Sequence, residues 1–485
     1  MLIVVFAASG CTGAKQWLHN GFKVGPNYRR PAAPVAEAWI DADDERVKCD
    51  EAADDWWSQL NDPTLDGLVE TAYLQNLDLQ TAGTRILEAR AQLNITAGNL
   101  FPQSQSAVAA YVRGQLPNSF GGLPVPSEFN LFASGFNASW EADFWGRYRR
   151  TIQASKANLN ASVDGYRDAL VMLLADVASN YVRYRTFQQR LEYARRNVEI
   201  QEGSLELAET KFNVGTTSEL DVQQARSNLA QTRSTIPPLE IGLRQTGNAL
   251  CILLGMPASD LSAMLEVQPI PTAPVELAVG IPADLLRRRP DVRRAERDVA
   301  AQSEQIGIAK ADLYPRLSIN GFIGYTGNDL KDLFAAKSFT GVVFPALQWN
   351  ILNYGRIVNN VRAQDARLKG KVLSYRQTVL RAGREVEDAL VAFLQTQVQA
   401  DRLEESVEAA VRSVELVSDQ YKGGVTDFNR VFNTQATLVN QQDQLAVARG
   451  NIALNLIAVY KALGGGWQSF GPPHATTSAG QCYRR

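Results

Sequence analysis

Histidine and cysteine are scarce in this chain, which has 2 histidines and 4 cysteines among 485 residues. Two histidines, His19 and His474, are too few for a histidine-rich metal or acid–base centre. The cysteines lie far apart and show neither a CxxC pair nor the short spacings of zinc sites. The sequence therefore predicts no metal site and no cofactor. The four thiols are those of Cys11, Cys49, Cys251 and Cys482.

Long apolar runs and net charge are also missing. No run of about 20 apolar residues is present, so no transmembrane helix is expected. The formal net charge is −2, which removes the basic field that would argue for nucleic acid as a partner. The run Arg287–Arg297 is interleaved with acidic residues, and we interpret it as a solvated, ion-paired face. Nucleophile-elbow and phosphate-loop motifs are absent as well, so we expect no enzyme.

The N-terminus carries a short apolar run, "LIVVFAASGC", that ends at Cys11. It resembles a bacterial lipoprotein signal, in which the cysteine is lipidated and becomes the first residue of the mature chain. We therefore predict a signal peptide over residues 1–10 and a palmitate-type lipid on Cys11. Ala8 stands where leucine is usual, and no Lys or Arg precedes the run, so we expect the start to be truncated or mis-assigned. A short buried strand is the alternative.

Residues 11–62 are predicted to form an extended, lipidated segment. This stretch is rich in proline and then acidic, which is typical of a linker rather than of a core. Helix signals begin near Leu65, and apolar residues then recur at three and four residues as far as Leu93.

Two stretches replace this helical pattern with two-residue alternation. The first is "GNLFPQSQSAVAAYVRG" (98–114) and the second is "KADLYPRLSINGFIGYTG" (310–327). Such alternation indicates strands. A second strand is expected after each, over residues 131–140 and 343–351. In the stretch 310–327 one parity holds Leu317, Ile319, Ile323 and Tyr325, and the other holds Arg316, Ser318, Asn320 and Thr326.

The chain contains two internal repeats. "LDLQTAGTRILEARAQLNITAGNLFPQ" (77–103) aligns with "PDVRRAERDVAAQSEQIGIAKADLYPR" (290–316), and "KFNVGTTSELDV" (211–222) aligns with "QYKGGVTDFNRV" (420–431). Each repeat is predicted to run helix, strand, loop, strand, long helix, glycine turn, helix. We assign the first repeat to residues 63–270, the second to 271–466, and a C-terminal tail to 467–485.

The predicted strands are long enough to cross a bilayer when tilted, and alternation of apolar and polar residues is the signature of a membrane barrel. A soluble antiparallel sheet packed on one face is the alternative. Four strands cannot close a membrane barrel, because about eight is the minimum. If the strands span a membrane, several chains must therefore share one barrel.

Two long helices are expected, over about 145–212 and 355–421. Sixty-odd residues at about 1.5 Å each give a length of roughly 100 Å. The helix that follows the first is expected to break at Pro237-Pro238. A scaffold coiled coil is an alternative for this part, although such a scaffold has no use for amphipathic hairpins between its helices. The coiled-coil seam of the second long helix is predicted at Val386, Leu390, Phe393, Ala400, Val407, Val411, Val414 and Tyr421.

Gly215 and Gly424 follow the two long helices at matching points of the repeats. A glycine at this point suits a left-handed C-cap. Thr216 with Glu219 suits a capping box that starts the next helix. We therefore predict a tight turn at each glycine.

Several motifs together resemble those of the TolC-like outer membrane factors. They are "FKVGPNYRRP", "DLLRRRPDVRRAERDVAAQSEQIGIAKADLYPRLSI", "FPALQWNILNYGR" and "EVEDAL". The resemblance covers the chain from Cys11 to about Gly466 and is nearest to the lipoprotein branch, which serves RND-type multidrug efflux pumps. The last residues, with Cys482, have no place in the pattern.

The resemblance implies an α+β membrane protein built as a homotrimer. Four strands per chain would form a shared twelve-stranded β-barrel in the cell outer membrane, lipid-anchored and continuous with a long helical barrel through the periplasm. The implied partners are outer-membrane lipid, a periplasmic adaptor (membrane fusion) protein, and an inner-membrane RND-type pump that supplies the energy. The adaptor would meet the helix tips, at residues that include Gly215, Ser218, Gly424 and Thr426.

The resemblance also implies a latch at a periplasmic gate. In the family, a tyrosine three residues before the second tip glycine bonds an aspartate six residues after the first. Tyr421 and Asp221 match these two positions. A second family latch uses an arginine two residues after the second glycine, where this chain has Thr426.

The constriction at this gate differs from the family pattern. Arg430 and Asn433 stand where the family often has acidic rings. We predict that three copies of Arg430 make the constriction cationic and disfavour cations in the pore. Pairing of Arg430 with Asp427 or Asp221 is the alternative.

The function implied by this resemblance is that of an outer-membrane exit duct of a tripartite efflux pump, which passively conducts drugs or other small toxic compounds. A type I protein-secretion channel and a coiled-coil envelope scaffold are the alternatives. The substrate itself is set mostly by the pump, which is another chain.

Overall fold

The computed structural model describes residues 14–48, 50, 53–115, 119–120, 123–124 and 128–471. The predicted signal peptide, the lipidation site Cys11 and most of the predicted C-terminal tail lie outside the described residues. The chain divides into two compact units. The sheet unit comprises Met1–Ala32, Arg85–Ser162 and Arg294–Tyr375, and the tip unit comprises Ala33–Thr84, Val163–Arg293 and Arg376–Arg485.

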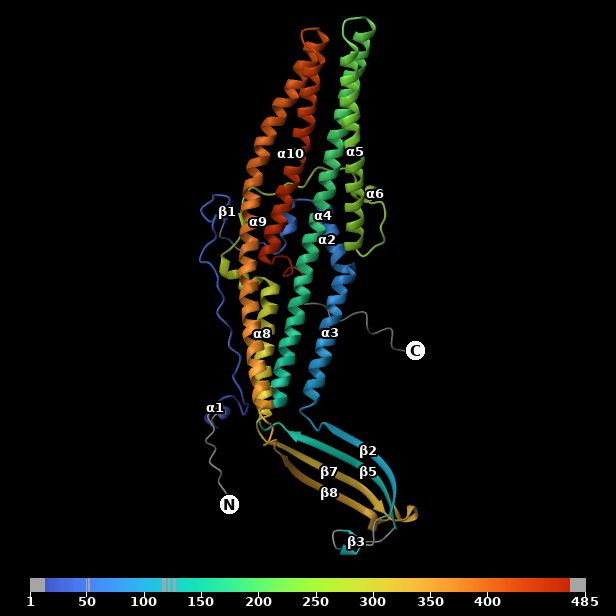
Figure 1. The fold of residues 1–485 in the computed structure, drawn as a ribbon, viewed down its shortest axis with the longest axis vertical. Helices are drawn as coiled ribbons and strands as arrows, with labels where there is room; N and C mark the ends of the chain where they lie inside the picture. The colour runs from blue at the N-terminus through green and yellow to red at the C-terminus, as the bar shows by residue number, and fades with distance from the viewer. Residues whose placement is uncertain are drawn as a thin grey trace. The chain divides into compact units, whose positions relative to one another are not determined.

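The sheet unit contains a four-stranded antiparallel sheet in the order β2-β5-β7-β8 (Figure 1). Two hairpins that are far apart in sequence therefore join along β5 and β7. Short strands β3 (Ser119–Phe120) and β4 (Leu123–Pro124) lie between β2 and β5 in the chain. The four long strands are β2 (Ser104–Gln115), β5 (Glu128–Ala142), β7 (Arg316–Gly327) and β8 (Phe339–Gln348). Two 3₁₀ turns, η3 (Leu330–Asp332) and η4 (Ala336–Ser338), connect β7 to β8.

The register of these strands puts the predicted apolar and polar residues on opposite faces. Phe136 is paired with Ile323, and their side chains are 65% and 55% exposed. On the other face the hydroxyl of Ser139 donates to Oδ1 of Asn320 at 2.7 Å. The predicted alternation is confirmed in β7, although Phe322 interrupts its polar face. Neighbouring strands add further apolar residues to that face, among them Leu131, Val342 and Phe344.

The fourth strand is shorter than predicted. β8 ends at Gln348, so the extension of the alternation to Trp349 and Ile351 is wrong. The indole N–H of Trp349 donates to the carbonyl of Leu313 at 3.1 Å. The chain then turns away from the sheet through two residues with left-handed backbone, Tyr354 and Gly355 (φ 50° and 80°), which lead directly into the next helix.

The N-terminal segment is extended over part of its length, as the sequence predicted, but other parts of it are folded and buried. It contains a short helix, α1 (Ala14–His19), and a strand, β1 (Val47–Lys48), which pairs in parallel with β6 (Leu277–Ala278). Trp39 and Trp56 are 5% and 1% exposed. Large aromatic side chains bury enough apolar area to order a segment whose proline content alone suggests a linker.

Arg150 holds part of this segment within the sheet unit. Its guanidinium donates to the carbonyls of Val24 at 3.2 Å and Gly25 at 3.1 Å, and it pairs with Glu304 at 2.7 Å. The side chains of Arg150 and Glu304 are 1% and 9% exposed. Charge-assisted bonds on every side therefore satisfy a cation that is closed off from water.

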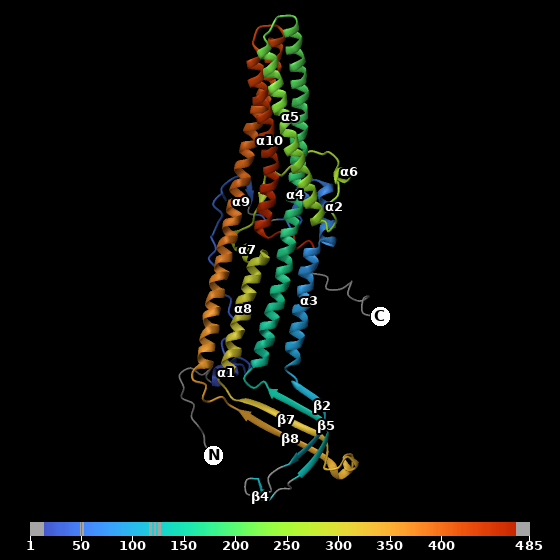
Figure 2. The same cartoon turned by 45° about the vertical axis from the view of Figure 1, so that its right-hand side comes forward.

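The helices dominate the chain. α4 and α9 have 67 residues each, which corresponds to roughly 100 Å of helix. In the tip unit α4 lies beside α5, and α9 lies beside α10, in both views (Figures 1 and 2). No described helix is long and apolar enough to cross a membrane. The α-helices are α2 (Pro63–Gln75), α3 (Leu77–Gly98), α4 (Arg147–Asn213), α5 (Glu219–Leu253), α6 (Ser262–Leu265), α7 (Leu285–Arg288), α8 (Pro290–Ala311), α9 (Arg356–Lys422) and α10 (Phe428–Leu463). Two further 3₁₀ turns are η1 (Trp56–Leu60) and η2 (Pro282–Asp284).

The predicted break at Pro237-Pro238 is wrong, because both prolines lie inside α5. Proline removes a helical hydrogen bond and ordinarily kinks or breaks a helix. Here Leu239 is buried against Leu191 and Ala194 of α4, and Ile236 packs on the same cluster. Packing on both sides of the proline pair keeps the helix continuous.

Two predictions about α9 and the arginine run are confirmed only in part. Val386, Leu390 and Phe393 of the predicted seam are each 0% exposed, but Val411 is 38% exposed. Arg289 is 8% exposed, so the interpretation as a solvated face is wrong for this residue. Its guanidinium pairs with Asp291 and with Glu385, each at 2.8 Å, and donates to the carbonyl of Ala462 at 2.7 Å. Glu385 and Ala462 come from distant segments, and for that reason the local sequence does not reveal the burial.

Candidate functional site at the helix tips

The turns α4–α5 and α9–α10 share one backbone geometry. Gly215 and Gly424 have φ of 78° and 74°, in the left-handed region that favours glycine. After each glycine an amide reaches back five residues, from Thr216 to the carbonyl of Lys211 and from Val425 to that of Gln420, both at 2.9 Å. These bonds close the Schellman type of C-cap. The predicted left-handed caps are therefore present at both turns.

The starts of the next helices differ from each other and from the prediction. α5 begins at Glu219 with Ser218 as N-cap and without a side-chain cap, so the predicted Thr216–Glu219 capping box is wrong. The hydroxyl of Thr216 instead donates to the carbonyl of Lys211 at 3.0 Å. At the second turn, Oδ1 of Asp427 accepts the amide N–H of Arg430 at 3.2 Å and caps α10.

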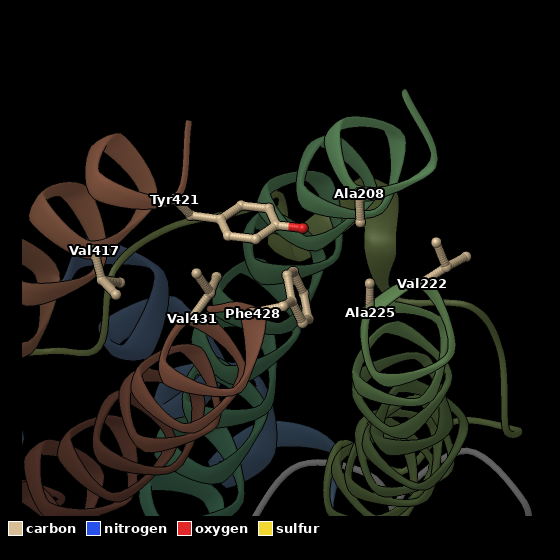
Figure 3. Close-up of a cluster of buried hydrophobic side chains, with 7 residues drawn as sticks. All are labelled: Ala208, Val222, Ala225, Val417, Tyr421, Phe428 and Val431. Atoms are coloured by element: carbon tan, nitrogen blue, oxygen red, sulfur yellow. The ribbon is translucent and has the colours of Figure 1, made fainter. Parts of the chain in front are cut away.

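A cluster of buried side chains joins all four helices next to these turns (Figure 3). Phe428 is 0% exposed, and its ring meets that of Tyr421 edge-on, with centroids 5.3 Å apart. In Figure 3 these two rings extend from α9 and α10 toward the small side chains of α4 and α5. Small residues let the helix pairs approach closely, so burial of the two rings holds the pairs together. The tip cluster consists of Ala208, Val222, Ala225, Val417, Tyr421, Phe428 and Val431.

A polar contact between α9 and α5 crosses the tip cluster. The phenol of Tyr421 donates to Oδ2 of Asp221 at 3.3 Å, and the hydroxyl of Thr217 donates to the same oxygen. Burial raises the pKa of the Tyr421 phenol, and the Asp221 carboxylate raises this pKa further. The phenol is therefore a neutral donor at physiological pH. The structure thus brings together the two residues that the sequence matched to a latch.

Lys211, in the last turn of α4, also contacts Tyr421. Its ammonium donates to the carbonyl oxygen of Tyr421. The same ammonium lies 4.7 Å from the centroid of the Tyr421 ring. Tyr421 is therefore bonded to α5 through its hydroxyl and to α4 through its carbonyl and ring.

The predicted constriction residues lie on an exposed face of α10. Arg430 and Asn433 are both exposed. Among the described residues, the Arg430 guanidinium forms no ion pair, and the Asp427 carboxylate meets only the backbone of Arg430. The side-chain pairing that we held as the alternative is therefore absent within one chain.

A second set of contacts joins α4, α5 and α10 farther from the turns. Nδ2 of Asn228 donates to Oε1 of Gln435 at 3.1 Å, and Nε2 of Gln435 donates to the hydroxyl of Ser204 at 2.8 Å. Nδ2 of Asn197 donates to Oε1 of Gln442 at 2.7 Å. Gln201 is 2% exposed, and neither polar atom of its amide has a hydrogen-bond partner. We call this set the amide seam, consisting of Asn197, Gln201, Ser204, Asn228, Gln435 and Gln442.

Sequence reasoning missed several of these residues. Lys211 could have been noticed as a basic residue in the last turn of a helix, where the negative end of the helix dipole stabilises a positive charge. The exposed apolar tip residues Val214, Leu220 and Val425 are 69%, 64% and 79% exposed, but no periodic pattern marks them. Within the described residues, no group of three or more His, Cys, Asp or Glu side chains is placed to hold a metal ion.

Known proteins share this fold, and several are about 30% identical to this chain. Residues 68–256 and 281–465 match the family described as outer membrane efflux protein. Nodulation protein T of Rhizobium leguminosarum bv. trifolii is 30% identical over 453 residues, which cover 93% of this chain and 96% of that protein. The toluene efflux pump outer membrane protein TtgF of Pseudomonas putida is 30% identical over 464 residues, covering 93% of this chain and 95% of that protein. The structure of the outer-membrane channel OprN superposes with a TM-score of 0.87 at 31% identity and covers 92% of this chain and 99% of that one.

The chain therefore belongs to the outer membrane efflux protein family. This confirms the predicted family and the mostly helical fold of an outer-membrane efflux channel. Members of the family are transport conduits and not enzymes. The chain accordingly works in the outer membrane by passive transport rather than by catalysis.

Proposed function

We propose that three copies of this chain form the exit duct of a tripartite efflux pump, which passively conducts drugs or other small toxic compounds. The observation that carries this proposal is the four-stranded sheet, whose apolar face is exposed at residues such as Phe136 and Ile323. An exposed apolar face of this kind needs lipid or a partner to cover it. Four strands are too few to close a membrane barrel, and three chains would supply twelve.

We infer that residues 63–270 and 271–466 are two structural repeats. The hairpins β2–β5 and β7–β8, the equal lengths of α4 and α9, and the matching caps at Gly215 and Gly424 support this inference. We place residues 1–10 as a signal peptide and Cys11 as a lipidated residue that adds an anchor to the barrel.

We propose that the tip unit is the periplasmic gate, with Tyr421 and Asp221 as its latch. The contact between them ties α9 to α5, so its loss would weaken the joint between the two helix pairs and shift the gate toward its open state. Arg430 is exposed and unpaired within the described residues, which supports the proposal that it lines the constriction together with Asn433.

We further propose that the turns around Gly215 and Gly424 meet a periplasmic adaptor that links the duct to an inner-membrane RND-type pump. Exposed Val214, Leu220 and Val425 would supply apolar contact area beside Ser218 and Thr426. Photo-crosslinkers placed at Ser218 and Thr426 should capture the adaptor. Capture of outer-membrane components alone would refute this placement.

The gate proposal is tested by single-channel recording in planar bilayers. Tyr421→Phe and Asp221→Ala should each raise the conductance of the purified trimer, because each removes the hydrogen bond that ties α9 to α5. Wild-type conductance in both variants would show that this contact is no latch. A protein that forms no channels at all would instead favour the scaffold function.

The proposed role of Arg430 has its own test. Arg430→Asp should increase cation preference and block by multivalent cations, because the ring of charge would change sign. Unchanged ion selectivity would show that this side chain does not line the constriction.

A further inference from the structure

Tyr421 contacts both α4 and α5, and only its contact with α5 belongs to the latch described above. Asp221 of α5 accepts from the phenol hydroxyl. Lys211 of α4 donates to the backbone carbonyl of the same residue and lies against its ring, 4.7 Å from the centroid. Both helices of the first pair therefore contact a single residue near the end of α9.

The backbone carbonyl of Tyr421, which Lys211 contacts, favours a cationic hydrogen-bond donor. Tyr421 lies in the last turn of α9, where its carbonyl accepts the amide N–H of Gly424 at 3.1 Å, keeps a second lone pair for Lys211, and carries the negative end of the helix dipole. A hydrogen bond from a charged donor is roughly twice as strong as one between neutral groups. The ring adds a cation–π contact to the same ammonium.

Lys211 also differs from Lys422 in how its charge is paired. Within the described residues its ammonium forms no ion pair, whereas Lys422, in the same tip, pairs with Asp419 one turn away on its own helix at 3.3 Å. The Lys211 ammonium therefore contacts a residue of the other helix pair, whereas the Lys422 ammonium pairs with a carboxylate of its own helix, α9.

We propose that Lys211 forms a second bond of the gate, independent of the latch, that holds the end of α9 against α4. This inference rests on the proposed function of the tip unit as a gate. The bond does not depend on the phenol hydroxyl, because its acceptor is the backbone.

The test is single-channel recording of the full-length trimer in planar bilayers. Lys211→Met keeps the length of the side chain but removes the ammonium, and it should raise the open-state population roughly tenfold, as the loss of one charge-assisted hydrogen bond predicts. Lys211→Arg retains a cationic donor and should restore most of the closed state. Lys422→Met removes a charge from the same tip and should leave the recordings unchanged.

Four outcomes separate this inference from the gate proposal. If Tyr421→Phe and Asp221→Ala open the channel and Lys211→Met does not, the latch stands and the role of Lys211 is refuted. If Lys211→Met alone opens it, Lys211 is the bond that closes the gate and the tyrosine–aspartate latch is refuted. If all three are silent, both are refuted. If each opens the channel and Lys211→Met adds to Tyr421→Phe, the two bonds are independent, as proposed.

A folding defect would also raise the current, so a second variant and a second measurement are needed. Lys211→Gln keeps a neutral donor and should give an open-state population between those of wild type and Lys211→Met. All variants should migrate as trimers on gels. Equal opening in Lys211→Gln, Lys211→Arg and Lys211→Met would show that the charge has no role and would overturn the inference.

Discussion

Two stretches of the tip unit join α4, α5 and α10 by opposite means, and the first of them, the tip cluster, also includes α9. In the tip cluster, Phe428 and Tyr421 bury their aromatic rings against small side chains. The hydrogen bonds from α9 to α4 and to α5 both involve Tyr421. In the amide seam, the contacts among α4, α5 and α10 are hydrogen bonds between amides and a hydroxyl, and the amide of Gln201 has no partner. Apolar burial contributes stability without strict geometry, whereas a buried polar network stabilises only when every member is paired. The tip is therefore the strongly held end of this helix packing, and the amide seam is the weakly held part.

The largest effect should come from emptying the tip cluster. Phe428→Ala removes a ring that is 0% exposed, and such changes cost about 3–5 kcal/mol. Hydrogen exchange should show the loss as faster exchange of amides in residues 425–435. Val425→Ala is the matched control, because that side chain is 79% exposed. Equal exchange in the two variants would contradict the assignment of the tip as the strongly held end.

An intermediate effect should come from breaking one pair in the amide seam. Gln435→Leu leaves the buried amide of Asn228 without its acceptor, which costs about 1–3 kcal/mol. Ser204 keeps a partner in the carbonyl of Ile200. Adding Asn228→Leu should restore most of the lost protection in hydrogen exchange, since the orphaned amide is then gone. Strictly additive losses would show that the two side chains do not act as a pair.

A smaller effect, of opposite sign, is expected at Gln201. Gln201→Leu replaces a buried amide without partners by an apolar side chain of similar size and should stabilise the tip unit by about 1 kcal/mol. The expected readout is slower exchange of the flanking amides in α4. Gln231→Leu, at an exposed position of α5, should change little. Destabilisation by Gln201→Leu would mean that this amide is paired in the assembled protein.

The smallest effect concerns pH. The pKa of Tyr421 is raised above 10 by burial and by Asp221. Below pH 10 the phenol is protonated in folded and unfolded chains alike, so its contribution to stability is fully present there. As pH rises past 10 the unfolded tyrosine ionises first and that contribution is lost. Conductance should stay constant up to pH 10 and then rise, and this rise should be smaller in Tyr421→Phe, which lacks the phenol but keeps the Lys211 contact. A rise that begins near neutral pH would point to another group.

Local patterns predicted the elements of the fold well, because each depends on residues close in sequence. Alternation in residues 316–327 indicated β7, and the absence of turn signals indicated the long helices. The caps at Gly215 and Gly424 followed from the repeat. The proximity of Tyr421 and Asp221 came from the family resemblance and not from any local pattern.

The features that sequence reasoning missed depend on distant partners. Arg289 is buried because Glu385 and the carbonyl of Ala462 surround it. α5 continues through Pro237-Pro238 because α4 packs on both sides of the pair. Lys211 meets Tyr421 across about two hundred residues of chain. Neither composition nor periodicity records such pairings.

The docking of the N-terminal segment has a consequence for the order of events during synthesis. The carbonyls of Val24 and Gly25 are bound by Arg150, which also needs Glu304, and β1 needs β6 at Leu277–Ala278. At about 5–20 residues per second, these partners leave the ribosome roughly tens of seconds after the segment itself. This segment is thus fixed only after its partners nearly three hundred residues later have been made. We expect it to remain accessible to processing enzymes until β6 and α8 have been synthesised, and to be immobilised only then.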